Sequence, residues 1–166
     1  MAMPWTYLFE LKALLPLRLV MGTLLVGLAV ACDPSVSEQF ETNGERIYFT
    51  STSETGDPIR YENDPFHMRM PLACADCHGA DGTGGRVTMM MRSFDAPDIT
   101  WAHLIEPHDD HGEEGHPPYD EQSLRRAITD GVDPGGNEFD ELMPRWRMSE
   151  SDLDDLVEFL MALEED

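Results

Sequence analysis

Two cysteines and a histidine stand within one short motif, Cys74-Ala75-Asp76-Cys77-His78. Two thiols at this spacing on a turn or short helix can each form a thioether with one vinyl group of a haem, and the imidazole that follows can bind the iron. A thioredoxin-like redox pair, half of a zinc site and a disulfide are the alternatives. However, no βαβ pattern surrounds the motif, no second cysteine pair completes a zinc site, and the disulfide loop would be strained. The motif therefore predicts one covalently attached haem c.

A second iron ligand has to come from a segment that returns to the opposite face of the haem. Met143 lies 65 residues after His78. Pro144 restricts it to an extended conformation, which suits a ligand loop. Met148 is the alternative, although it adjoins the start of an expected helix. The other methionines near the haem motif, which we expect to fill apolar gaps in the haem pocket or the core, are Met68, Met70, Met89, Met90 and Met91.

Three helices are expected to position these ligands. The clearest starts at Ser149, which forms a capping pattern with Asp152, and apolar residues then recur at helical spacing over 153–161. Another starts near Asp120 and stops at Gly131. The earliest is signalled by Thr42 and Glu45, and the glycine between them would let another helix cross closely. No alternating strand pattern is apparent, so the sequence predicts an all-α, loop-rich domain.

Together these features resemble a class I cytochrome c domain over about residues 41–165. The shared motifs are Gly44-x-x-x-Tyr48, Cys74-Ala75-Asp76-Cys77-His78-Gly79, Pro97-Asp98-Ile99-Thr100, Met143-Pro144 and the terminal amphipathic helix. The resemblance implies a cytochrome c-like fold, in which the first and last helices cross near Gly44 and Tyr48 and a few helices wrap one haem. It also implies that the backbone carbonyl of Pro97 accepts the His78 ring proton. Two insertions, at about 49–73 and 103–118, depart from compact members of the family.

The N-terminus is predicted to direct export. Residues 1–31 are expected to be a lipoprotein-type signal peptide, because the apolar run 19–31 is shorter than the roughly 20 residues that span a bilayer. The end of this run resembles the lipobox of bacterial lipoproteins and makes Cys32 the expected lipidation site. Residues 32–40 would be a tether and 41–166 the cytochrome c domain. Cleavage without lipidation and an uncleaved anchor helix are the alternatives. The expected location is the periplasmic side of the membrane, with Asp33 favouring the inner membrane.

The chain is strongly acidic, with a net charge of −22. From Cys32 onward it has nine arginines, no lysine and 32 acidic residues, which gives a net charge of −23. Nucleic acid is excluded as a partner, because binding needs cations that neutralise phosphates. Two interpretations of the charge are open: adaptation to high salt, and a surface that docks basic redox proteins. The expected partners are redox proteins and, through the lipid anchor, the membrane.

Four histidines fall within residues 103–116, among several carboxylates. Imidazoles and carboxylates together can bind Cu²⁺, Zn²⁺ or Ni²⁺. The residues that would form this second metal site are His108, His111 and His116, while His103 lies nearby. The alternative interpretation is a solvated loop of an acidic protein.

The function predicted from these residues is one-electron transfer in a respiratory or other membrane chain. His78 and Met143 would hold the iron, and a methionine ligand predicts a positive reduction potential. Such a carrier is not itself an enzyme. A haem enzyme with an open distal position, a haem subunit of a larger oxidoreductase complex and a copper- or metal-handling haem protein are the alternatives.

Overall fold

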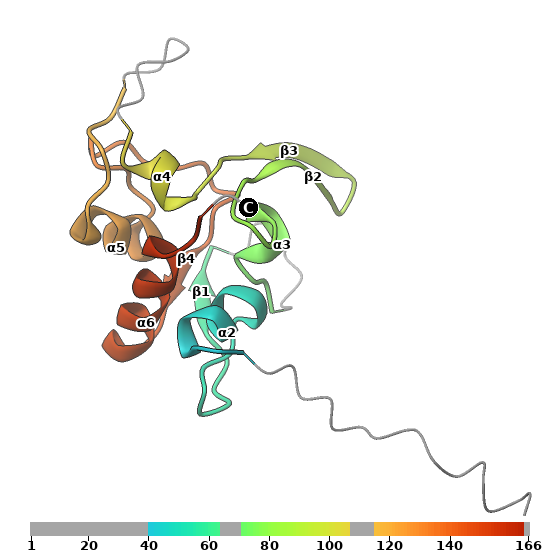
Figure 1. Cartoon of the computed structure of the whole chain (residues 1–166). Helices are drawn as coiled ribbons and strands as arrows, with labels where there is room; N and C mark the ends of the chain where they lie inside the picture. Colours follow the sequence, from blue (N-terminus) through green and yellow to red (C-terminus); the bar gives the residue numbers. More distant parts are fainter. Residues whose placement is uncertain (1–39, 64–70, 107–114, 165–166) are drawn as a thin grey trace, which may run out of the picture. The chain divides into compact units, whose positions relative to one another are not determined.

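The computed structural model describes residues 40–63, 71–106 and 115–164, which all belong to the unit Phe40–Asp166. In chain order the elements are α2 (Asn43–Thr50), β1 (Arg60–Glu62), α3 (Ala75–His78), β2 (Gly85–Met89), β3 (Arg92–Ala96), α4 (Trp101–Leu104), α5 (Glu121–Asp130), β4 (Arg145–Arg147) and α6 (Glu150–Met161) (Figure 1). The predicted signal peptide, Cys32 and all but the last residue of the predicted tether lie outside the described residues. Within these residues, no helix combines the length and the apolar character that a membrane crossing requires.

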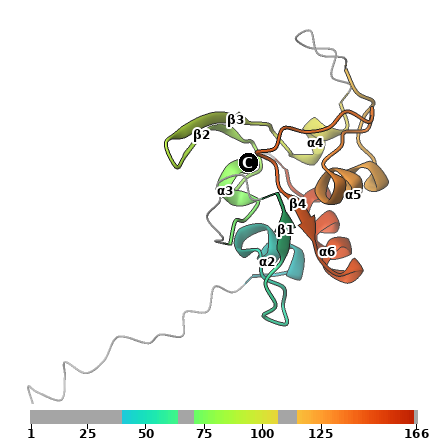
Figure 2. The same ribbon diagram turned by 180° about the vertical axis from the view of Figure 1, so that it is seen from behind.

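The first and last of these helices, α2 and α6, pack directly against each other, as both views of the ribbon show (Figures 1 and 2). They meet at Gly44, where a Cβ atom would overlap the backbone oxygen of Asp155. The side-chain amide of Asn43 donates hydrogen bonds to Asp152 (3.0 Å) and Asp155 (2.7 Å), which fastens the start of α2 to α6. The helix crossing that the resemblance implied at Gly44 is therefore confirmed.

The three expected helix starts and the one expected helix end are also confirmed. The side chains of Thr42, Asp120 and Ser149 accept hydrogen bonds from the backbone N–H groups of Glu45, Ser123 and Asp152. Each cap satisfies a donor that the helix itself leaves unpaired. Helix α5 ends at Gly131, whose φ of 69° is the left-handed conformation that favours glycine.

Two small antiparallel sheets correct the prediction of an all-α domain. Strand β1 pairs with β4, and β2 pairs with β3 in a hairpin. Strands β1 and β4 have three residues each and are far apart in the chain, so neither leaves a local pattern. The hairpin turns at Met90 and Met91, both with positive φ, and lacks the glycine or asparagine that usually signals such a turn. The strands are short additions to a mainly helical domain, and β4 contributes Trp146 to its core.

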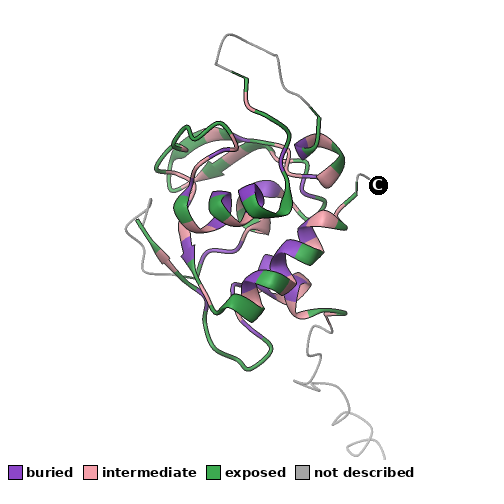
Figure 3. Cartoon of the chain, turned by 90° about the vertical axis from the view of Figure 1, so that its left-hand side faces the viewer, coloured by how far each residue is buried: buried purple, intermediate pink, exposed green. Residues whose placement is uncertain are grey.

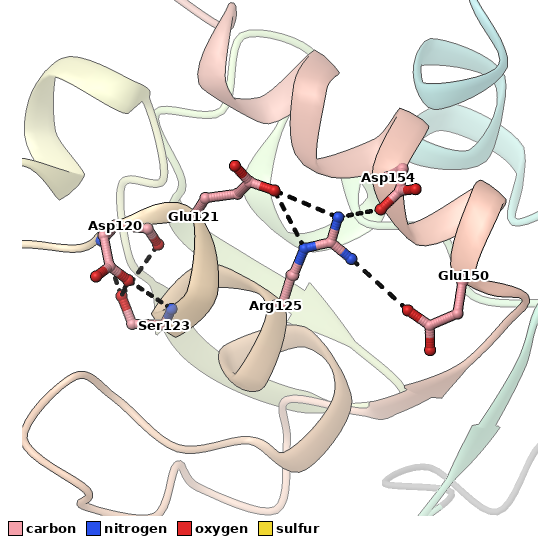
Figure 4. A network of polar contacts seen from close by, with 6 residues as sticks. All are labelled: Asp120, Glu121, Ser123, Arg125, Glu150 and Asp154. Carbon is pink, nitrogen blue, oxygen red and sulfur yellow. Dashed lines mark hydrogen bonds and ion pairs between the residues drawn. The ribbon is translucent and has the colours of Figure 1, made fainter.

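The core lies between α2, α5, α6 and β4, and buried stretches run along one side of the helices (purple in Figure 3). Helix α6 buries Leu153, Leu156, Val157 and Leu160, as its spacing predicted. On the outer surface, the guanidinium of Arg125 on α5 pairs with Glu121 on its own helix and with Glu150 and Asp154 on α6 (Figure 4). Apolar packing inside and this ion-pair network outside hold α5 against α6.

Candidate functional site

A cavity of about 890 Å³ opens beside this core. Volumes of roughly 300–1,000 Å³ are usual for sites that hold small molecules and cofactors. Its walls bring together Cys74, Cys77 and His78 from the region of α3, Pro97 from the segment after β3, and Met143 from the segment before β4. The rest of the wall is largely apolar and includes Leu72, Leu104, Leu124, Ile128, Leu156 and Leu160.

The two thiols at α3 are both free. Burial raises the pKa of Cys74 to about 12 and that of Cys77 to about 11. Thiols with such values stay protonated at neutral pH, whereas a redox C-x-x-C pair works through a thiolate of lowered pKa. The environment of the pair therefore disfavours a thioredoxin-like redox centre and leaves two thiols at the cavity wall for covalent attachment.

The ring of His78 is held in one orientation by a backbone carbonyl. Its Nδ1 lies 2.9 Å from the carbonyl oxygen of Pro97, the contact that the resemblance implied. Because a carbonyl only accepts, Nδ1 carries the proton and Nε2 keeps a lone pair for a metal. Burial lowers the pKa of His78, which favours the neutral, metal-binding form of the ring.

A glycine brings this carbonyl to the histidine. The backbone N–H of Gly84 donates to the carbonyl oxygen of His78 (2.9 Å). The φ of Gly84 is 68°, and a Cβ atom there would overlap the carbonyl oxygens of Ala96 and Pro97. Only a residue without a side chain lets the two segments approach so closely. The orientation of His78 thus depends on a close backbone contact that Gly84 permits.

Met143 is half-buried at the cavity wall, on the loop that leads into β4. Pro144 after it is buried, and the backbone N–H of Met143 donates to the carbonyl of Asp140 (3.1 Å). Met148, the alternative ligand, packs against the core and is not among the described residues that line the cavity. Its position at the cavity wall favours Met143 over Met148 as the candidate iron ligand.

The remaining methionines are only in part where we expected them. Met89 packs partly against the core. The prediction was wrong for Met90, which is 60 % exposed, and for Met91, which is fully exposed, because both form the hairpin turn. Met68 and Met70 lie outside the described residues.

The second metal site predicted at His108, His111 and His116 is described only at His116. The Nδ1 of His116 lies 2.9 Å from the carbonyl oxygen of Pro117, and its ring packs edge-on against Tyr119. In the part of the chain that the structure describes, no three His, Cys, Asp or Glu side chains are grouped to hold a metal ion. His103 and His116 both line the large cavity. The second metal site stays a prediction.

Sequence reasoning missed two residues that contact the Met143 loop, Asn63 and Arg145. Arg145 stands close to Met143 in the chain, so a search for donors beside the expected ligand would have found it. Asn63 gives no such signal. It reaches the loop only because β1 pairs with β4, across some 80 residues of chain.

The residues at this cavity fit a covalently bound haem. Two free thiols stand beside an imidazole whose Nε2 is available, a thioether lies on the wall, and the surroundings are apolar. Thioether links, imidazole and thioether sulfur are the groups that hold haem c.

A comparison with protein families agrees with this geometry. The family model described as cytochrome c matches residues 62–164, which is more than half of the chain. No curated protein and no solved structure gave a significant match. The family binds haem c covalently and serves haem-based electron transfer, generally without enzymatic activity of its own. With the haem motif, the cavity and the crossing of α2 with α6 inside one domain, this chain belongs to the cytochrome c family.

Proposed function

We propose that the protein is a one-electron carrier with a single haem c, attached at Cys74 and Cys77 and ligated by His78 and Met143. The haem supplies one-electron chemistry, as its iron alternates between the ferrous and ferric states. The observation that carries the proposal is that all four residues line one largely apolar cavity. Pro97 would keep the His78 ring oriented in both oxidation states.

The same surroundings support a positive reduction potential. A thioether ligand favours ferrous iron relative to a second imidazole. Apolar walls act in the same direction, because low dielectric penalises the extra charge of the ferric site. The acidic chain, with 33 carboxylate residues, works against both effects by stabilising ferric iron. Salt screens the exposed charges beyond about 10 Å at 0.1 M, so the opposing effect comes mainly from the carboxylates that line the cavity, among them Asp98 and Asp133. We expect the thioether ligand and the apolar walls to outweigh these few charges.

The location of the carrier is part of the proposal. The sequence from Leu28 to Cys32 supports a lipid anchor at Cys32 on the periplasmic side of the membrane, where the domain would exchange electrons with membrane complexes. Labelled palmitate should enter the wild-type chain, and Cys32→Ala should abolish that labelling. Labelling that survives in Cys32→Ala would contradict the anchor.

The haem ligands are tested by absorption spectra of the wild type, Met143→Ala and Met148→Ala. We expect a ferric methionine–iron charge-transfer band in the wild type and in Met148→Ala, and its loss in Met143→Ala. Only the ferrous Met143→Ala variant should bind carbon monoxide readily. The pyridine haemochrome assay should give one haem per chain.

Two results would overturn the proposal. A wild type without the band that binds carbon monoxide readily has an open distal site, which favours the enzymatic alternative. A band that survives in Met143→Ala and disappears in Met148→Ala assigns the ligand to Met148.

A further inference from the structure

The loop that carries Met143 is fastened to the rest of the domain by the side chain of Asn63. Its Nδ2 donates hydrogen bonds to the carbonyl oxygens of Glu141 (3.0 Å) and Met143 (3.3 Å). Its Oδ1 accepts a hydrogen bond from the backbone N–H of Arg145 (2.9 Å). One amide group therefore uses both its donor and its acceptor to join the end of β1 to both sides of Met143.

Arg145 holds the same loop from the other end. Its guanidinium donates to the carbonyl oxygens of Phe139 (2.9 Å), Asp140 (3.2 Å) and Met143. The side chain lies against Gly131, where a Cβ atom would overlap it. Among the described residues Arg145 forms no ion pair, although the chain is rich in carboxylates. In the described part of the chain, its guanidinium thus forms hydrogen bonds to backbone carbonyls of the Met143 loop rather than to a carboxylate.

Both residues depend on the pairing of β1 with β4. Glu62 lies opposite Arg145 in that ladder, and Asn63 follows at its end with a φ of 50°. Asparagine is one of the few residues apart from glycine that adopts this left-handed conformation readily. The backbone conformation and the three hydrogen bonds thus both suit asparagine at position 63.

We propose that Asn63 and Arg145 are positioning residues that hold Met143 against the haem iron, so that part of the 49–73 insertion serves to keep the distal ligand bound. The inference rests on the proposed function, because it requires Met143 to be the ligand. When Met143 leaves the iron, the loop moves and loses its hydrogen bonds to Asn63 and Arg145. The two side chains thereby lower the population of the open state.

An added ligand such as imidazole measures this population directly. Imidazole can bind ferric iron only when Met143 has left, so its apparent dissociation constant is its intrinsic constant divided by the open fraction. A variant that weakens the hold on the loop raises the open fraction and lowers the apparent constant by the same factor. A variant that only weakens the fold elsewhere leaves the constant unchanged.

The experiment is an imidazole titration of the ferric holoprotein, followed by its absorption spectrum. Asn63→Gly keeps a residue that tolerates positive φ but removes all three hydrogen bonds, and Arg145→Gln removes the guanidinium. We expect the apparent dissociation constant to fall about 5–30-fold in Asn63→Gly and about 10–100-fold in Arg145→Gln, because bonds from a charged donor are stronger. Asn63→Asp keeps the acceptor and loses the donors. Its apparent dissociation constant should lie between those of the wild type and Asn63→Gly.

Glu62→Gln is the matched control. Glu62 adjoins Asn63, and its carboxylate accepts hydrogen bonds from Arg147 across the same two strands (2.8 Å) rather than from the Met143 loop. We expect its dissociation constant for imidazole to stay within about twofold of the wild type. In a Met143→Ala background, the further change Asn63→Gly should have no more than a twofold effect, because the ligand it would position is gone.

The proposal is overturned if Asn63→Gly and Arg145→Gln change imidazole affinity no more than Glu62→Gln does. It is also overturned if the effect of Asn63→Gly persists in the Met143→Ala background. Failure of the proposed function has a different signature, because the wild type itself would then lack the methionine–iron band.

Discussion

Two walls of the cavity, one with His78 and one with Met143, differ in how far apart their residues lie in the sequence. The thiols, the imidazole, Gly84 and the Pro97 carbonyl all come from residues 74–97. The Met143 loop depends on Asn63, on Gly131 beneath Arg145 and on the pairing of β1 with β4. The proximal side, with the haem motif, is therefore local in sequence, whereas the distal side, with Met143, is assembled from distant segments.

This difference has a physical consequence. Regions held by solvent-exposed hydrogen bonds open at lower free energy than the buried core. The three hydrogen bonds of Asn63 to the Met143 loop are of this exposed kind. We expect the distal side to open first under stress and the proximal side to persist until global unfolding.

Of the substitutions that test this difference between the two sides, the replacement of Trp146 should have the largest effect. Trp146 is 3 % exposed on β4 and packs edge-on against Tyr61 of β1, so its ring supports the strand pair behind the Met143 loop. Trp146→Ala should lower the free energy of unfolding by about 3–5 kcal/mol. In a denaturant titration its methionine–iron band should disappear well before the far-ultraviolet dichroism, while the haem stays attached.

Trp146→Phe is the control for this variant. Trp146→Phe keeps an aromatic ring between β1 and β4 and removes the indole N–H, which has no hydrogen-bond partner among the described residues. The free energy of unfolding of Trp146→Phe should stay much closer to that of the wild type. Coincident loss of both signals in Trp146→Ala would show that the two sides do not differ.

On the proximal side, the most informative change is Gly84→Ala. The added Cβ would overlap the Ala96 and Pro97 carbonyls, which should cost about 1–3 kcal/mol and move the Pro97 carbonyl away from His78. A weaker hydrogen bond makes the imidazole less basic, so the midpoint potential should rise while the methionine–iron band persists.

Gly85→Ala separates crowding from backbone strain. Gly85 also has a positive φ, of 101°, but nothing lies within 4 Å of its Cβ position. It should lower stability without moving the potential. Equal shifts of potential in the two variants would contradict the role assigned to the Pro97 carbonyl.

Tyr48→Phe should have a smaller effect. The Tyr48 hydroxyl donates to the carbonyl of Gly79 (2.7 Å) and ties α2 to the end of α3. Its loss should lower the free energy of unfolding by about 0.5–1.5 kcal/mol, measured by denaturant titration. Because the bond touches neither ligand, both the potential and the methionine–iron band should stay unchanged, and a shift in either would show that α2 also acts on the haem.

The smallest expected effect is the pH dependence of the Glu62–Arg147 pair. The hydrogen bond from Arg147 lowers the pKa of Glu62. A carboxyl whose pKa is lowered by folding contributes stability above its unfolded pKa of about 4.3, and this stability is lost as the pH falls through the folded value. Thermal unfolding should therefore show Glu62→Gln slightly less stable than the wild type near pH 7 and equal to it near pH 3. A difference that persists at the lower pH would exclude ionisation of Glu62 as its cause.

The sequence was sufficient to predict features whose signals lie close to them in the chain. The caps at Thr42, Asp120 and Ser149 and the haem motif all lie within a few residues of what they determine. It was insufficient where a feature depends on distant pairing, as in β1 and β4, or on an unusual turn, as at Met90 and Met91. Pro144 was enough to single out the Met143 loop, which lies at the cavity wall, but the sequence did not reveal the side chains that hold that loop.

The contact at Gly44 has a consequence for the order in which the protein matures. Asn43 and Asp155 are 112 residues apart, so α2 cannot bury its Gly44 face until α6 is available. Closing so long a segment is slow compared with forming α3, whose hydrogen bonds are all local. Cys74 packs against the core that α6 completes, so before docking we expect its thiol to be more accessible and its pKa closer to the ordinary value. We therefore expect haem attachment to precede the docking of α6, and the final helix to act as the closing step of maturation.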